Sequence, residues 1–117
     1  MEILKAVGAL GALAQETRLR IFRALVQRGP DGVPAGRIAA LLDLPGPTLS
    51  FHLSKLERAG LVRCRRDGRS LIYAADYAAI EGLVAYLTEN CCGRGLACTP
   101  GARTSARATS RSRAARG

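Results

Sequence analysis

The sequence predicts a mainly α-helical domain with one small β-hairpin, an α+β fold, and three observations support this prediction. Apolar residues recur at helical spacing through most of the first 90 residues, as at Ile3, Val7 and Leu10. The pair Asp67-Gly68 separates two short runs of strand-forming residues, which is a strong hairpin signal. A length of 117 residues suits one domain rather than two.

Local signals bound five expected helices. The sequence Gly29-Pro30-Asp31-Gly32 ends the second helix, and Gly60 ends the fourth because glycine readily adopts the left-handed conformation that follows a helix. Pro47 suits the first position of the fourth helix, where its missing N–H would have no helical partner in any case. The expected helices span residues 3–14, 15–28, 35–42, 47–59 and 76–89.

One apolar stripe on each helix is expected to build the core, since only five residues are aromatic and Leu, Ile, Val and Ala must supply most of the packing. The expected strands are 61–66 and 69–74, and Cys64, which alternates with Val62, is expected to be a buried structural thiol. The apolar side chains that define the later stripes are Leu19, Phe22, Leu25 and Val26, then Ile38, Leu41 and Leu42, then Leu49, Leu53 and Leu56, and finally Tyr77, Ile80, Val84 and Leu87.

The order helix, helix, helix, turn, helix, hairpin, helix is a DNA-binding arrangement, a helix-turn-helix followed by a two-stranded wing. The second helix of such a motif lies in the major groove and needs short polar side chains on its outward face. Thr48, Ser50, His52 and Lys55 meet this need, and Phe51 can contact a thymine methyl group.

Arginines flank the tip of the expected hairpin and suit contacts with phosphate or the minor groove, foremost Arg66 and Arg69 together with Arg65. The alternative interpretation is a solvated helix face and a charged hairpin with no ligand. His52 taken alone could equally be packed partly against the core.

The net charge of +9 favours a polyanionic partner. Five of the arginines lie in residues 99–117, a segment without acidic residues or apolar periodicity that is expected to be disordered. This Arg-rich tail is either a solvated extension or a weak additional attraction for DNA. The expected division is therefore a DNA-binding and dimerisation domain over 1–92 and a C-terminal segment over 93–117 that contains Cys98.

Several function classes are not expected. No apolar run approaches the ~18 residues that a membrane span needs, and the first helix, interrupted by Lys5, is interpreted as a packing helix rather than a signal peptide. A cytoplasmic location, where thiols stay reduced, is expected. Neither a Cys-x-x-Cys motif, a phosphate loop nor an acid/base constellation is present, so an enzyme is not expected, and DNA binding should need no cofactor.

Three stretches resemble the ArsR/SmtB family of repressors. Residues 50–62 (SFHLSKLERAGLV) are similar to the family's recognition helix, residues 14–22 (AQETRLRIF) to the entry of its second helix, and residues 66–73 (RDGRSLIY) to its wing. The resemblance covers about residues 5–90 and implies a homodimer joined through the first and last helices. It also implies that the free protein occupies double-stranded operator DNA and leaves it when an effector binds.

The effector site implied by many arsenic-sensing members, a Cys pair in the first helix of the motif, is absent, since residues 35–42 contain no Cys. Instead Cys91, Cys92 and Cys98 resemble the C-terminal arrangement of another arsenic-responsive branch. Trivalent arsenic is soft and prefers three thiolates in a trigonal pyramid, and Gly93 and Gly95 would allow the chain to fold back.

A structural zinc site would want a fourth ligand, so arsenite or antimonite is the expected effector. Arg94 could help to deprotonate the thiols. The alternatives left open are a methylated trivalent arsenical, another soft metal, thiol oxidation at Cys91 and Cys92, and incidental thiols without a function.

Overall fold

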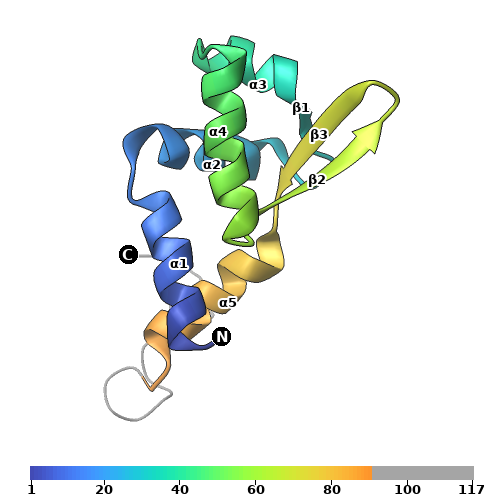
Figure 1. The fold of residues 1–117 in the computed structure, drawn as a ribbon. Coiled ribbons are helices and arrows are strands. Elements are labelled where there is room, and N and C mark those ends of the chain that lie inside the picture. The colour runs from blue at the N-terminus through green and yellow to red at the C-terminus, as the bar shows by residue number, and fades with distance from the viewer. Residues whose placement is uncertain (91–117) are drawn as a thin grey trace. The chain divides into compact units, whose positions relative to one another are not determined.

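The computed structural model describes residues 1–90, and its first compact unit is Met1–Tyr86. Five helices and a three-stranded antiparallel sheet of order β1-β3-β2 make up this part (Figure 1). All five expected helices are present, and the predicted α+β winged helix-turn-helix is confirmed. The elements are α1 (Ile3–Leu13), α2 (Glu16–Arg28), β1 (Val33–Pro34), α3 (Ala35–Leu42), α4 (Gly46–Arg58), β2 (Val62–Asp67), β3 (Ser70–Ala75) and α5 (Tyr77–Thr88).

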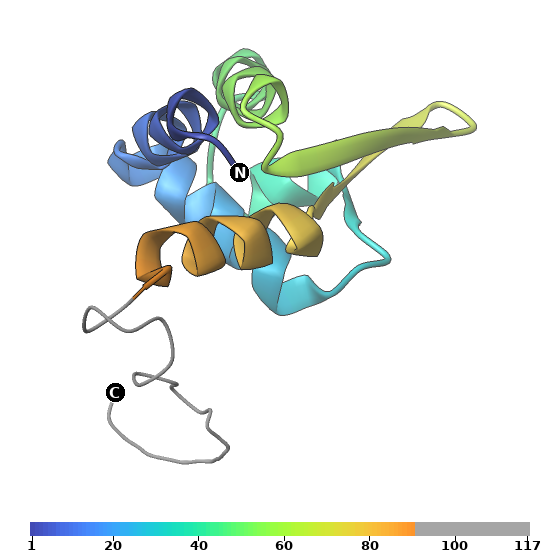
Figure 2. The same ribbon diagram turned by 90° about the horizontal axis from the view of Figure 1, so that it is seen from below.

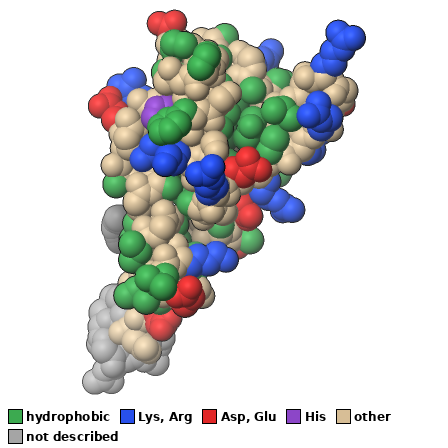
Figure 3. All heavy atoms as spheres, in the orientation of Figure 1, with side chains coloured by type: hydrophobic (Ala, Val, Ile, Leu, Met, Phe, Trp, Pro, Cys, Tyr) green, Lys and Arg blue, Asp and Glu red, His purple; other side chains and the backbone are tan. Residues whose placement is uncertain are grey.

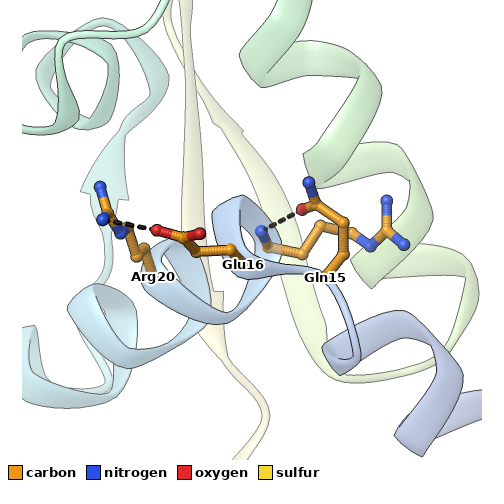
Figure 4. Close-up of polar contacts among 4 residues, drawn as sticks. Gln15, Glu16 and Arg20 are labelled. Carbon is orange, nitrogen blue, oxygen red and sulfur yellow. Dashed lines mark hydrogen bonds and ion pairs between the residues drawn. The ribbon is translucent and has the colours of Figure 1, made fainter.

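Side chains and glycines define the helix ends much as the sequence indicates. The first turn of α2 is closed by Gln15, whose side-chain oxygen accepts the Arg18 N–H at 2.8 Å (Figure 4). One turn on, Arg20 pairs with Glu16 at 2.7 Å, but both side chains are exposed and such a pair contributes little to stability (Figure 4). Helix α4 begins one residue earlier than expected, at Gly46, and Gly60 follows its end with a φ of +79°.

The hairpin β2–β3, called the wing below, projects away from the helices (Figure 2). Asp67 pairs with Ser70, so the loop is Gly68-Arg69 rather than Asp67-Gly68, and both strands run one residue past their expected ends. A positive φ at Gly68 and not at Arg69 is the pattern of a type II′ turn, which suits the twist of two paired strands. The short strand β1, which pairs with Ile72 and Tyr73, was not expected.

The core gathers side chains from α2, α3, α4 and the sheet. The largest fully buried side chains are Ile21, Leu25, Ile38, Leu53, Leu56 and Leu61. The stripe predicted for α4 is confirmed, because Leu49, Leu53 and Leu56 are all buried. The inward prediction for Leu19 on α2 was wrong, since this side chain is 43% exposed, and Leu41, one of the apolar side chains noted on α3, is 47% exposed. At about 100° per residue, Leu19 lies about 160° around α2 from the buried Ile21 and so falls outside the stripe.

The two outer helices bury fewer large side chains than their stripes predict. Helix α1 buries Ala6 and Ala9, whereas Ile3, Val7 and Leu10 are 62%, 57% and 43% exposed. In α5 the buried residue is Leu83, while Val84 and Leu87 are exposed. Small side chains let α1 pack closely against its neighbours, and the large ones are left at the surface (Figure 3).

The expectation for Cys64 was wrong in degree, because this thiol is half-buried rather than buried. It lies on β2 directly opposite Tyr73 of β3, at the edge of the sheet rather than in its centre. Burial, followed by the hydrogen bond and the charge of Cys64, raises the pKa of Tyr73 to about 12. The phenol therefore stays neutral at any physiological pH.

Candidate nucleic-acid interface

The turn between α3 and α4 sets the direction of the second helix of the motif. Asp43 adopts the left-handed conformation with a φ of +55°, which Asp tolerates better than most residues. Its N–H donates to the Ala40 carbonyl at 3.4 Å, and the Leu44 N–H donates to the Ala39 carbonyl at 3.0 Å. These bonds close the end of α3 in the manner of a Schellman motif, and α4 then starts afresh at Gly46.

The outward face of α4 is centred on Phe51. At about 100° per residue, Phe51 lies about 170° from the middle of the buried stripe Leu49, Leu53 and Leu56. Its side chain is 56% exposed, which is unusual for a large apolar residue among polar neighbours. Of the other predicted base-reading residues, Thr48, Ser50 and Lys55 are exposed and His52 is half-buried. The structure thus brings all five onto the surface of one helix.

Two neighbours hold the Phe51 ring in place. The Lys55 ammonium lies 5.3 Å from the ring centroid, within the range of a cation–π contact. The His52 ring meets it edge-on, with centroids 5.4 Å apart and the planes at 67°. An exposed aromatic ring that is supported on two sides is a preformed apolar contact surface in the middle of a polar helix face.

His52 is connected to α2 through Arg18, a residue that sequence reasoning did not single out. The Arg18 Nη1 lies 3.4 Å from His52 Nδ1, and the Arg18 Nε donates to the Ala12 carbonyl at 2.7 Å. Burial, and after it the positive charge of Arg18, lowers the pKa of His52 below its ordinary value of 6.5. His52 is therefore neutral at pH 7. Arg18 lies in the stretch 14–22 that resembles the family, but its contact with His52 joins positions 34 apart in the sequence, so no local pattern indicated it.

The wing adds positive charge beside α4. Arg66 and Arg69 are both exposed close to its tip, where Figure 3 shows Lys and Arg side chains. Arg65 points its guanidinium to the Asp31 carbonyl at 2.9 Å, so it fastens the wing to the loop before β1. Residues 46–75 contain six Lys or Arg and two Asp or Glu. This excess suits a polyanion laid across both elements.

The predicted effector residues Cys91, Cys92 and Cys98, and the whole segment 93–117, lie outside the described residues. Within residues 1–90, His, Cys, Asp and Glu side chains form no group of three that could hold a metal ion. None of the helices in this part of the chain combines the length and the hydrophobicity of a membrane span.

Comparisons with curated proteins place these features among transcriptional regulators. A helix-turn-helix domain family model matches residues 13–65. The chain is 31% identical over 83 residues to the transcriptional activator HlyU of Vibrio cholerae, a match that covers 71% of this chain and 74% of HlyU. It is also 31% identical to the regulator KmtR of Mycobacterium tuberculosis, covering 71% of this chain but only 62% of KmtR. A putative arsenical resistance operon repressor ArsR of Halobacterium salinarum is 43% identical over 63 residues, which are 54% of this chain and 48% of that repressor.

Solved structures agree with the fold. An ArsR-like transcriptional regulator from Rhodococcus sp. RHA1 superposes with a TM-score of 0.65 at 27% identity, covering 72% of this chain and 76% of that protein. The homodimeric winged helix-turn-helix domain of Mb0332 from Mycobacterium bovis gives a TM-score of 0.59 at 29% identity, covering 74% and 80%. The relatives are regulators and not enzymes, in agreement with the expectation from sequence. The chain therefore belongs to the ArsR family of winged helix-turn-helix transcriptional regulators.

Proposed function

We propose that the protein binds operator DNA as a homodimer, represses transcription, and is released when trivalent arsenic binds Cys91, Cys92 and Cys98. The observation that carries the DNA-binding part is the exposed face of α4, which presents polar side chains around Phe51 beside a strongly basic wing. Polar groups on such a helix read base edges, while arginines on the wing bind phosphate without regard to sequence.

The roles follow from the chemistry of each side chain. Thr48 and Ser50 lie in the first two turns of α4, where a helix in the major groove meets the base edges. Lys55 lies a turn further on, and as a cation it suits a phosphate or guanine contact. Phe51 is proposed to contact thymine through its ring, because the thymine C5 methyl group is the apolar group that base pairs present in the major groove. Arg66 and Arg69 are proposed to bind phosphate or to enter the minor groove.

The homodimer is supported by the surface of α1. Ile3, Leu4 and Val7 are each more than half exposed, and their spacing of one and three residues places them on one face of α1. Such an apolar surface on a small protein marks an association site, and the related Mb0332 domain is homodimeric. A two-fold dimer also matches the symmetry of operators whose half-sites lie one DNA turn apart.

The arsenic part is supported by thiol spacing and by relatives. Three Cys fall within eight positions, enough for the three thiolates that trivalent arsenic prefers. The Halobacterium relative is named a putative repressor of an arsenical resistance operon, and a solved structure 32% identical to this chain is titled a possible regulator for arsenical resistance. Arsenite is the proposed effector, with antimonite, a methylated arsenical, another soft metal and thiol oxidation as the outcomes to be separated.

The coupling would run through α5, which ends at Thr88, three positions before Cys91. The first turn of this helix is anchored to the DNA-binding part, because the Tyr77 hydroxyl donates to the Val26 carbonyl at 2.8 Å. The Asp76 carboxylate accepts the Ala79 N–H at 3.1 Å and caps the same turn. A displacement of the C-terminal end of α5 would thus be transmitted through its first turn to α2. A coupling free energy of roughly 1–3 kcal/mol would lower operator affinity about 5- to 150-fold.

The test uses an operator duplex that the protein selects from a random DNA pool, titrated with arsenite under reducing conditions. Wild type should dissociate, and Cys91→Ser, Cys92→Ser and Cys98→Ser should stay bound. Cys64→Ser is the matched control and should respond like wild type, because Cys64 lies on β2. If all variants respond like wild type, the three-thiolate site is wrong and only the DNA-binding proposal remains. A site for a methylated arsenical, which needs two thiolates, would survive the loss of Cys98.

A further inference from the structure

Arg18 makes contacts with three separate parts of the fold. Its own N–H is held by the Gln15 side chain at the start of α2, and its Nε donates to the Ala12 carbonyl at the end of α1 at 2.7 Å. The remaining arm of the guanidinium reaches α4, where Nη1 lies 3.4 Å from His52 Nδ1. The Gln15 bond holds the backbone of Arg18, and the bond from Nε to Ala12 orients its guanidinium, so the arm that reaches His52 acts from a defined direction.

The chemistry of the pair decides which nitrogen of His52 carries the proton. A guanidinium has five N–H donors and no acceptor, and it does not lose its proton in proteins. His52 Nδ1 must therefore accept from Arg18, and in the neutral ring the proton then resides on Nε2. Burial and the charge of Arg18 both favour the neutral ring, since each lowers the pKa of His52.

We propose that Arg18 is a positioning residue that holds His52 in the Nε2–H tautomer, so that His52 donates a hydrogen bond to an acceptor on a base edge. This inference rests on the proposed function, in that α4 reads DNA. In the major groove the acceptors are purine N7, guanine O6 and thymine O4, whereas adenine and cytosine amino groups are donors. Arg18 would thus select a base pair that presents an acceptor, without touching DNA itself.

Among residues 1–90, Arg18 is the one charged group that shifts the pKa of His52, so no other charge opposes the Nε2–H tautomer. Arg18 faces the imidazole from α2, and its charge is the one that contributes to the shift. On α4 itself, Lys55 lies one turn further on and its ammonium is placed over the Phe51 ring. The Phe51 ring packs against the imidazole in a T-shaped contact, and because its ring is not titratable it does not affect the protonation of His52.

The tautomer is measured directly by NMR of the 15N-labelled imidazole. The chain contains a single His, so its signals need no assignment. Wild type should show an unprotonated Nδ1 and a protonated Nε2 at pH 7, with a pKa below 6.5. Arg18→Met keeps the length of the side chain but removes the donor, and it should give a mixture of tautomers with the pKa raised toward 6.5. A wild-type spectrum with the proton on Nδ1 overturns the proposal.

The functional consequence is read from operator affinity and its dependence on base chemistry. Arg18→Met should bind the selected operator roughly tenfold more weakly, from the two hydrogen bonds of the dimer. Removing one acceptor at a time from the selected operator should reveal a position where wild type loses affinity and His52→Ala does not: 7-deazapurines remove N7, 2-aminopurine removes guanine O6, and 5-methyl-2-pyrimidinone removes thymine O4. If no acceptor position responds in this way, His52 does not donate to a base edge. Arg20→Met is the matched control, because it removes one positive charge from the same helix and breaks only the exposed pair with Glu16.

The outcomes separate the two proposals. If wild type binds no selected DNA, the proposed function fails, whereas the NMR spectrum still reports the tautomer. If Arg18→Met folds and its tautomer and pKa equal those of wild type, the positioning role of Arg18 is wrong although DNA binding stands. If Arg18→Met does not fold, Arg18→Lys replaces it, since lysine keeps a donor at that position. This variant should retain the Nε2–H signal. If circular dichroism shows that Arg18→Lys is folded but the signal is lost, the proposal is wrong.

Discussion

Thymine recognition by Phe51 leads to a prediction in which the DNA, rather than the protein, is changed. Replacing one thymine by uracil removes only the C5 methyl group and leaves every hydrogen-bonding group in place. Phe51 has 56% of its surface exposed and is already held between Lys55 and His52, so little ordering is needed for contact. Burying one methyl group against the ring stabilises the complex by about 0.8 kcal/mol. For two symmetric half-sites this is about 1.6 kcal/mol, or roughly a 15-fold change in affinity.

The assay is fluorescence anisotropy on the selected operator, with each symmetric pair of thymines replaced by uracil in turn. One pair should show the loss for wild type, and the same replacement should have no effect on Phe51→Ala. Leu41→Ala is the control variant, because Leu41 is 47% exposed but lies on α3. Phe51→Ala should keep its stability within about 0.5 kcal/mol, since an exposed side chain adds little to the core. The reasoning is refuted if no position responds, or if Phe51→Ala retains the same response as wild type.

The remaining predictions concern the core, the wing and His52. Leu56→Ala should lower the free energy of unfolding by about 2–5 kcal/mol, measured by urea denaturation, because Leu56 is fully buried, and a cost equal to that of Leu41→Ala would contradict its place in the core. Arg66→Ala and Arg69→Ala should each reduce the slope of log affinity against log salt by about 2 for the dimer, with an unchanged slope ruling out phosphate contact. The pKa of His52 is lowered in the folded state, so the unfolded chain takes up the proton first as the pH falls below about 6.5. Stability should therefore decline from pH 7 toward the folded pKa, and this decline should be absent in His52→Gln, as measured by denaturation at successive pH values.

The sequence by itself determined the five helices, the wing hairpin and the outward face of α4. The glycines and prolines around residues 29–32, 45–47 and 60 mark where helices stop and start, since their backbone conformations are restricted or unusually free. The spacing of Leu49, Leu53 and Leu56 was enough to place Thr48, Ser50 and Lys55 outward, because one helix period decides both faces at once. These are local properties, and they do not depend on what the helix packs against.

Tertiary structure decided which apolar residues are buried and which polar side chains meet. Leu41 carries the same hydrophobic signal as the buried Ile38 one turn earlier on α3, and only the positions of the adjacent elements leave it exposed. Strand β1 forms because Val33 and Pro34 pair with β3 some 40 positions later in the sequence, so no local pattern predicts it. The contact between Arg18 and His52 likewise joins α2 to α4 across 34 positions. Hydrogen bonds and burial of this kind depend on the packing of distant segments, whereas periodicity within a helix reports only on that helix.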